Sequence, residues 1–206
     1  MPLVAVAWPG LRGARASLEI APDHDAIDID ALDLARSQVV LVTNLGRMTL
    51  TFAPDLAPNH VRNFLELSRS GFYDGTRFHR VVRDKIVQGG CPNTKAGATG
   101  KPGFGSPGHT VDAEFSDARH VRGVLSMARG RGENSAGSQF FLCHGEVPSL
   151  DGRYTVFGRV DSGLDTLDKI AEQPVRDVDG IPTPIEPVHL YRAVVLPVLA
   201  DSEGKK

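Results

Sequence analysis

The sequence predicts a mainly β fold, a closed or nearly closed antiparallel β-barrel whose ends are covered by helices. Many short stretches of strand length follow one another along the chain, and only a few stretches have helical spacing. Strands and helices do not alternate, which argues against a parallel α/β sheet. The chain of 206 residues, 41% of them hydrophobic, is long enough for one domain with an extension or for two very small domains.

The elements of this barrel can be placed from residue 38 onward. The stretch VVLVTNLGRMTLTFA, residues 39–53, predicts a hairpin that turns at Asn44-Leu45-Gly46. APNHVRNFLELSRSGF, residues 57–72, predicts a helix, because Pro58 suits a first turn and Gly71 suits a C-terminal stop. A second helix is predicted at residues 163–173. Further strands are predicted at residues 78–83, 86–89, 123–128, 139–143, 154–160 and 188–196.

Residues 1–37 differ from the rest and are predicted to be an N-terminal extension of unknown role. Five aspartates lie between residues 23 and 33, but the spacing of a calcium-binding loop is missing. A solvated face, or a short helix from about Ile29, is the better interpretation. The first residues lack the basic region of a signal peptide, so we expect a cytoplasmic protein. The barrel domain is expected to span residues 38–197, and residues 198–206 to form a polar tail.

The composition argues against several classes of function. A formal net charge of -2 gives no sign of a nucleic-acid-binding protein, and no run of 18 apolar residues predicts a membrane span. The two cysteines, Cys91 and Cys143, are expected to be reduced thiols, and the scattered histidines suggest no metal site. The glycines near residues 97–108 match the letters of phosphate-binding motifs, but the structural context that such motifs need is missing. We interpret residues 89–108 as one long glycine-rich surface loop.

An arginine stands within an apolar segment at FHRVVRDKIVQGG, residues 78–90. Strand alternation would place Phe78, Arg80 and Val82 on one face, with His79 and Val81 on the other. Such an arginine can be an ordinary edge-strand residue, with its stem on apolar surface and its head in water. From this segment alone, that interpretation and a functional one both stay open.

A second alternating segment, NSAGSQFFLC, covers residues 134–143. Its spacing places Gln139, Phe141 and Cys143 on one face of a strand, and Phe140 and Leu142 on the other. GVLSMARGRG precedes it, and PSLDGRYTVFGRV follows it with a turn at residues 151–152 and a further strand.

Together, FHRVV…QGG, GVLSMAR…NSAGSQFF and LDGRYTVFGRV resemble the cyclophilin family of peptidyl-prolyl cis-trans isomerases. The form MARGRGENSAGSQFF is similar to the bacterial branch, and the resemblance covers about residues 38–197. It implies an eight-stranded antiparallel barrel closed by two helices, with a peptide groove on the outside of the barrel. It also implies proline-containing peptides and unfolded or loop segments of proteins as partners, in a reaction that needs no cofactor or metal.

The resemblance also implies a role for individual residues. Arg80 would be the catalytic residue, with Gln88 and Gln139 as its polar partners. The other residues implied to bind substrate fall into a proline pocket, a wall that pairs with the peptide, and the neighbouring tyrosine: Phe141, Ile86 and Leu150; Ala128, Arg129 and Gly130; Tyr154.

Three positions depart from the pattern of the family. Lys85 stands where a pocket-lining phenylalanine is common, and Ile86 where methionine is frequent. Ser149 stands where members that bind cyclosporin well carry tryptophan, so we expect weak cyclosporin binding. We also expect a monomer. Lys85 leaves open an alternative function, a module that binds proline-containing peptides with weak or no isomerase activity.

The chemistry of the reaction suits these residue types. Amide resonance holds an X-Pro bond planar behind a barrier of roughly 18–20 kcal/mol. The twisted transition state leaves a lone pair on the prolyl nitrogen, and a guanidinium that donates to it stabilises that state selectively. Arginine suits this task because it stays charged and its donors are fixed in a plane.

Overall fold

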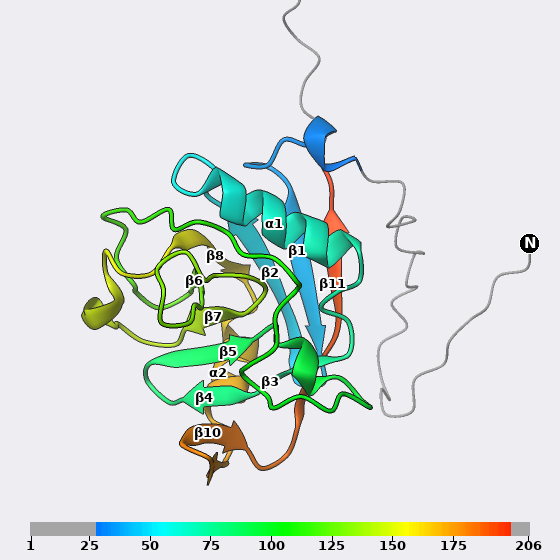
Figure 1. Cartoon of the computed structure of the whole chain (residues 1–206), viewed down its shortest axis with the longest axis vertical. Coiled ribbons are helices and arrows are strands. Elements are labelled where there is room, and N and C mark those ends of the chain that lie inside the picture. The colour runs from blue at the N-terminus through cyan, green and yellow to red at the C-terminus, as the bar shows by residue number, and fades with distance from the viewer. Residues whose placement is uncertain (1–27, 199–206) are drawn as a thin grey trace, which may run out of the picture.

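The computed structural model describes residues 28–198, which form an antiparallel β-barrel with two helices (Figure 1). The strands of the barrel are β1 (Gln38–Thr43), β2 (Gly46–Phe52), β3 (Thr76–Phe78), β4 (Arg80–Val82), β5 (Ile86–Gly89), β6 (Val124–Met127), β7 (Phe140–Cys143), β8 (Val156–Ser162) and β11 (Val188–Leu196). The helices are α1 (Pro58–Arg69) and α2 (Leu164–Ala171), and the connections between strands include short 3-10 turns such as η3 (Pro92–Thr94) and η4 (Pro148–Leu150). The predicted fold class is confirmed.

The barrel closes through a strand that is interrupted at His79. The nine strands run in the order β3-β11-β1-β2-β8-β6-β7-β5-β4, so β3 and β4 are the two edges of the sheet. These edges are consecutive in the chain, with His79 alone between them. Because β3 pairs with β11 and β4 pairs with β5, the interrupted strand links both ends of the sheet. If β3 and β4 are counted as one interrupted strand, the barrel has eight strands, the number that the family resemblance implies.

The interruption at His79 makes the alternation predicted for residues 78–82 wrong. Phe78 and Val81 both belong to the apolar core of the barrel, whereas Arg80 does not. An unbroken strand would place Phe78 and Val81 on opposite faces. The predicted alternation of the second segment is confirmed, because Phe140 and Leu142 are core residues while the residues between and after them lie in a separate apolar cluster.

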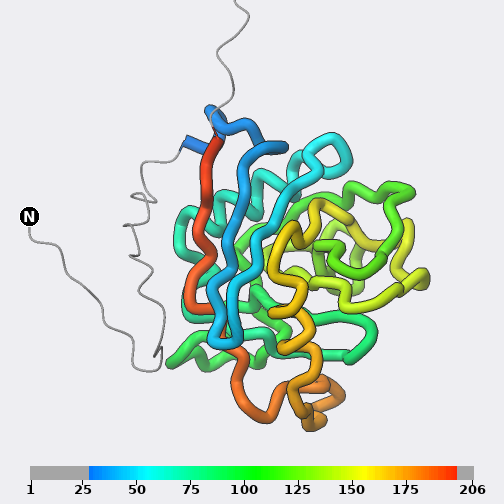
Figure 2. The backbone as a smooth tube through the Cα atoms, turned by 180° about the vertical axis from the view of Figure 1, so that it is seen from behind, coloured from blue at the N-terminus to red at the C-terminus, as the bar shows by residue number. Residues whose placement is uncertain are grey.

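The two helices lie at different ends of the barrel, with α1 in the upper part of the view and α2 in the lower part (Figure 1). The apolar side of α1 is fully buried, and the Phe64 ring contacts the rings of Phe140 and Phe157 at centroid distances of 5.2 and 5.4 Å. Seen from behind, β11, β1 and β2 lie side by side (Figure 2). The helices begin and end within three residues of the predicted bounds.

A carboxylate from a distant loop caps the N-terminus of α1. Ala57, at the N-cap position, makes no side-chain cap hydrogen bond. Instead, Glu114 accepts hydrogen bonds from the backbone N–H groups of Asn59 and His60, at 3.1 and 3.0 Å, and from Nδ1 of His60 at 2.6 Å. Burial would raise the pKa of Glu114, but these hydrogen bonds lower it below its usual value. This contact ties the loop before β6 to the helix.

The described part of the N-terminal segment packs against the barrel. Ile29, in the 3-10 turn η2 (Ile29–Ala31), and Leu32 are buried in the main core. The backbone N–H of Asp33 donates to the carbonyl oxygen of Val198, just beyond β11. The short helix expected from about Ile29 is therefore a single 3-10 turn. The predictions for residues 1–27 and 199–206 concern residues outside the range that the structure describes.

Two features of the fold differ from the sequence-based expectation. Strands β9 (Val175–Val178) and β10 (Ile181–Pro184) form a separate hairpin that the sequence did not lead us to predict. The glycine-rich stretch 89–108 is more than a surface loop, because it contains η3 and buries Cys91 completely.

Both cysteines are free thiols. Within residues 28–198 no helix is long and apolar enough to cross a membrane.

Candidate functional site

The candidate site is a row of neighbouring residues across four strands on the outside of the barrel. Arg80 of β4 pairs with Gln88 of β5, Gln88 pairs with Phe141 of β7, and Phe141 pairs with Ser126 of β6. Residues paired in this way direct their side chains to the same face, about 4.5–5.5 Å apart at Cβ. The antiparallel ladder thus brings together side chains that are up to 61 residues apart in the sequence.

The polar half of this row is a chain of hydrogen bonds that begins at Arg80. Its Nη1 donates to Oε1 of Gln88 at 3.2 Å, and Nε2 of Gln88 donates to Oε1 of Gln139 at 3.1 Å. Nε2 of Gln139 then donates to the carbonyl oxygens of Gly103 and Gly105, at 2.9 and 3.0 Å. The structure therefore brings Arg80, Gln88 and Gln139 together; their roles in substrate binding and catalysis stay a prediction.

The two carbonyl acceptors at the end of this hydrogen-bond chain determine the orientation of both glutamine amides. The carbonyl groups of Gly103 and Gly105 can only accept, so the amide nitrogen of Gln139 must face them. Its oxygen then faces Gln88, whose own oxygen must face Arg80. A flip of either amide would bring two donors or two acceptors together. Arg80 is thus held by an acceptor whose direction is set by two backbone carbonyls.

The other half of the site is a small apolar cluster, separate from the barrel core. Its buried members are Ile86, Phe141, Cys143 and Val147, and its partly buried members are Val82, Val124, Ala128, Leu150 and Tyr154. Val82, Ile86 and Cys143 form a second row, two residues along each strand from Arg80, Gln88 and Phe141. In such an arrangement the apolar surface can bind an apolar ring while the neighbouring guanidinium presents a charged donor to it.

Phe141 is held in place by aromatic neighbours on two sides. Its ring stacks on the imidazole of His120 at a centroid distance of 5.9 Å, and it meets the ring of Tyr154 edge-on at 5.7 Å. His120 is fixed in turn by Asp151, whose Oδ1 is 2.9 Å from Nδ1, and by Ser126, whose Oγ is 3.0 Å from Nε2. Phe141 is only 2% exposed, so its ring forms a rigid floor beside Arg80.

The Ser-His-Asp contacts beneath Phe141 do not form a nucleophilic site. Ser126 is fully buried, and its hydroxyl donates to the carbonyl oxygen of Thr155 at 2.9 Å. A nucleophile must reach its substrate, and this hydroxyl has no access to one. The contacts of His120 therefore support the aromatic floor.

A pocket of about 310 Å³ adjoins the polar half of the site. Its lining includes Gln88, Gln139 and the three consecutive residues Ala128, Arg129 and Gly130. The Arg129 guanidinium lies over the Tyr154 ring, 4.9 Å from its centroid, and its Nε donates to the carbonyl oxygen of Arg153 at 3.1 Å. Residues 128–130 thus form one wall of the pocket.

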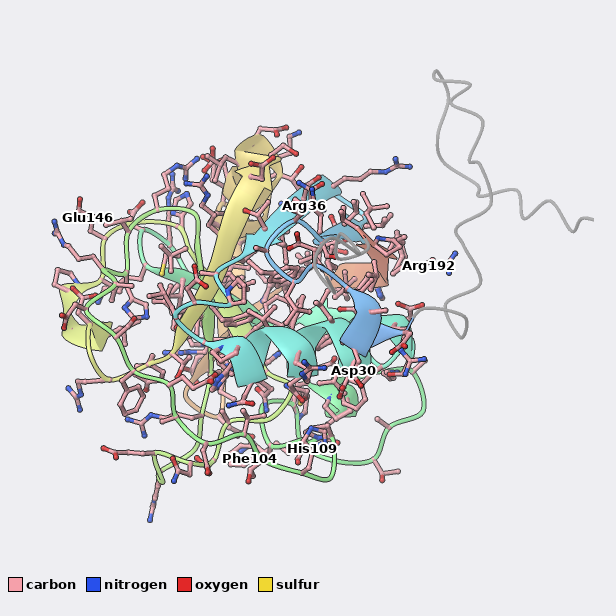
Figure 3. The ribbon with its side chains drawn as sticks, turned by 90° about the horizontal axis from the view of Figure 1, so that it is seen from above. Asp30, Arg36, Phe104, His109, Glu146 and Arg192 are labelled. Carbon is pink, nitrogen blue, oxygen red and sulfur yellow. The ribbon has the colours of Figure 1, made fainter. Side chains whose placement is uncertain are left out.

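The glycine-rich loop also lines this pocket. Phe104, 71% exposed, and Ser106 line it together with the two glycines that accept from Gln139. Figure 3 shows Phe104 and His109 along one edge of the molecule, away from Glu146. The composition of the loop gave no sign that its backbone would contact Gln139, because the contact joins residues 34–36 positions apart.

The structure places the remaining predicted and unpredicted residues as follows. Lys85 lies in the exposed turn between β4 and β5, where its carbonyl oxygen accepts from the N–H of His144 at 2.8 Å; its part in the pocket stays a prediction. Sequence reasoning missed His120, Cys91 and His79. A His-containing segment before a strand could have pointed to His120, but nothing local distinguishes the other two. Among the described residues, no three His, Cys, Asp or Glu side chains gather as a metal site would require.

The comparisons with known proteins agree on one family. The model of the cyclophilin type peptidyl-prolyl cis-trans isomerases matches residues 38–195, more than half of the chain. The chain belongs to the cyclophilins. A peptidyl-prolyl cis-trans isomerase of Synechococcus elongatus is 45% identical over 125 residues, which are 61% of this chain and 81% of the relative. One of Helicobacter pylori is 41% identical over 150 residues, 70% of this chain and 87% of the relative.

Solved cyclophilins have the same fold. The crystal structure of a Cryptosporidium parvum cyclophilin, determined in the presence of the dipeptide Ala-Pro, superposes with a TM-score of 0.68 at 32% identity and covers 77% of this chain and 98% of that chain. A cyclophilin from Hirschia baltica gives a TM-score of 0.62 at 26% identity, covering 87% of this chain and 77% of the other. The predicted family, fold class and enzyme class are thus confirmed, and the cyclophilin barrel carries the row around Arg80 on its outer face.

Proposed function

We propose that the groove around Arg80 accelerates cis-trans isomerisation of X-Pro peptide bonds in proline-containing peptides and in unfolded or loop segments of proteins. The observation that carries the proposal is the pairing of Arg80, Gln88 and Phe141 in one row. This row sets an oriented guanidinium on the same face as an apolar cluster that can receive a proline ring. The family membership of the chain and of its isomerase relatives supports the same activity.

In this proposal the apolar cluster holds the proline ring and Arg80 acts on the rotating bond. Ile86, Phe141 and Leu150 grip the ring while the rest of the peptide turns. As the amide twists, a lone pair develops on the prolyl nitrogen, and Arg80 donates a hydrogen bond to it. This contact is stronger in the twisted state than in either planar state, which is the requirement for catalysis.

The neighbouring groups support this donor without competing with it. Gln88 occupies one N–H of the guanidinium and leaves the others for substrate. Because glutamine carries no charge, it orients the guanidinium without neutralising it. Tyr154 and residues 128–130 would contact the peptide on either side of the proline. We further propose that the unit acts as a monomer in the cytoplasm and needs no cofactor.

The test is an isomerisation assay on a short X-Pro peptide with the wild type and Arg80→Ala. Loss of one preorganised donor costs about 10²–10³ in rate, so kcat/KM should fall by that factor. Arg47→Ala removes an exposed arginine on the β1–β2 hairpin and serves as the matched control. An Arg80→Ala protein that is folded and as active as the wild type would refute the role of Arg80.

A second candidate function follows from Lys85. Lys85 is exposed and stands where the family pattern has a phenylalanine that lines the pocket. This substitution favours a module that binds proline-containing peptides and isomerises them poorly. The same assay separates the two. A wild type that binds an Ala-Pro peptide in a titration, but accelerates its isomerisation less than tenfold, would support the binding module.

A further inference from the structure

A buried cysteine outside the row of site residues contacts the glycine-rich loop through its sulfur. Cys91 lies two residues after the end of β5 and is fully buried. Its Sγ lies 3.2 Å from the backbone nitrogen of Gly103 and 3.4 Å from that of Gly105, and it accepts a hydrogen bond from each. Sulfur is a weak acceptor, but two N–H groups that converge on one atom fix the loop at two points.

The loop is shaped to make these two contacts. Gly103 has a φ of +87°, a conformation that residues with a side chain rarely adopt. A Cβ at Gly105 would lie 2.7 Å from Cγ of Pro92, so glycine alone permits the loop to approach η3 this closely. Asn93 adds a third attachment, since its Nδ2 donates to the carbonyl oxygen of Lys101 at 3.0 Å. The loop is thus held against the turn that Cys91 begins.

The same two glycines are the anchor of the hydrogen-bond chain that ends at Arg80. Their N–H groups donate to Cys91, and their carbonyl groups accept from Gln139. Cys91 therefore binds the N–H group of each glycine, and Gln139 binds the carbonyl group of each. Because these carbonyls set the orientation of the Gln139 amide, the position of the sulfur controls which atom Gln88 presents to Arg80.

We propose that Cys91 is a positioning residue for Arg80, acting through the glycine-rich loop, Gln139 and Gln88. The inference rests on the proposed function, in which Arg80 is the catalytic residue. Without an acceptor at position 91 the loop loses two of its attachments, and the carbonyls of Gly103 and Gly105 move away from Gln139. The Gln139 amide can then turn, and Gln88 loses its partner. The guanidinium of Arg80 is left without a fixed acceptor.

The test compares Cys91→Val, which removes the acceptor and adds the volume of about one methyl group, with Cys91→Ser, which keeps an acceptor. Each lost hydrogen bond is worth about a threefold to tenfold change in an equilibrium, so we expect kcat/KM of Cys91→Val to fall roughly threefold to tenfold, mainly in kcat. Cys91→Ser should recover most of the rate. In two-dimensional ¹⁵N spectra, the side-chain amide signals of Gln139 and Gln88 should shift in Cys91→Val and return close to their wild-type positions in Cys91→Ser.

Controls separate this inference from a general loss of stability. Ser68→Ala also removes one fully buried polar atom, on α1, and should leave rate and amide signals unchanged. If Cys91→Val does not fold, Cys91→Ala takes its place. Unchanged amide signals in a folded Cys91→Val, or equal rates for Cys91→Val and Cys91→Ser, would overturn the positioning role. An inactive wild type would refute the proposed function instead, and the amide signals would still decide whether Cys91 orders the chain.

Discussion

The buried imidazole of His79 should make the stability of the protein depend on pH, and His79→Leu should remove that dependence. His79 is 4% exposed, and neither ring nitrogen has a hydrogen-bond partner among the described residues. Burial is the main cause that lowers the pKa of His79 from 6.5 to about 4; the charge of Arg80 reinforces it, and the polar groups of the Arg77 backbone and the Gln139 side chain oppose it. The folded protein therefore keeps His79 neutral at pH values where the unfolded chain binds a proton.

The size of the effect follows from these two pKa values. Between pH 6.5 and 4 the unfolded state binds more protons at this site, so the free energy of unfolding falls as the pH is lowered through this window. A difference of about 2.5 pKa units corresponds to about 3 kcal/mol over the whole window, and to about 2 kcal/mol between pH 7.5 and pH 5. Above pH 7 the contribution vanishes.

The assay is urea unfolding of the wild type and His79→Leu at pH 7.5 and pH 5. Leucine is close to histidine in volume and does not titrate, so all other titrating groups cancel in the difference between the proteins. The wild type should lose about 2 kcal/mol more than the variant when the pH is lowered. Equal losses would show that His79 binds its proton as readily in the folded state as in the unfolded one, and the argument from burial would fail.

Two further predictions concern the helix cap and inhibitor binding. Glu114→Gln should lower the free energy of unfolding by about 1–2 kcal/mol at pH 7, because α1 loses its anionic cap; the loss should shrink as the pH falls through the lowered pKa of Glu114, and an unchanged urea midpoint at pH 7 would contradict it. Cyclosporin should bind the wild type weakly, and Ser149→Trp should bind it at least tenfold more tightly in a calorimetric titration. Equal affinities would show that Ser149, in the turn η4 beside Leu150, does not limit binding.

Local patterns were sufficient to predict most of the fold. The hairpin at residues 39–53 has strong alternation and a turn of suitable residues, and α1 has a proline at its start and an apolar face. Their bounds were predicted to within a few residues. The interruption at His79 was not predictable, because it depends on two partners, β5 and β11, that pair with either side of the break. The β9–β10 hairpin has exposed residues throughout β9, so it carries no alternating pattern.

For the site, motifs identified the central side chains but not the contacts that hold them in place. Arg80, Gln88, Gln139 and Phe141 lie in segments whose letters resemble a known family. Cys91 was evaluated only as a possible disulfide or metal ligand, because a contact from its sulfur to a loop 12 and 14 residues later leaves no periodicity in the sequence. A contact of this kind depends on backbone direction, which residue identities do not specify.

The interrupted strand has a consequence for the order in which the protein can fold during synthesis. Arg80 directly follows the break, and β3 on the other side of the break pairs with β11, the last strand of the barrel. A ribosome-bound chain that lacks residues 188–196 can form the β4–β5–β7 ladder but leaves one side of this strand unpaired. Pairings between distant segments form late. The strand that carries Arg80 is therefore paired on both sides of the break only after residues 188–196 have been synthesised, so the barrel around the site closes late in synthesis.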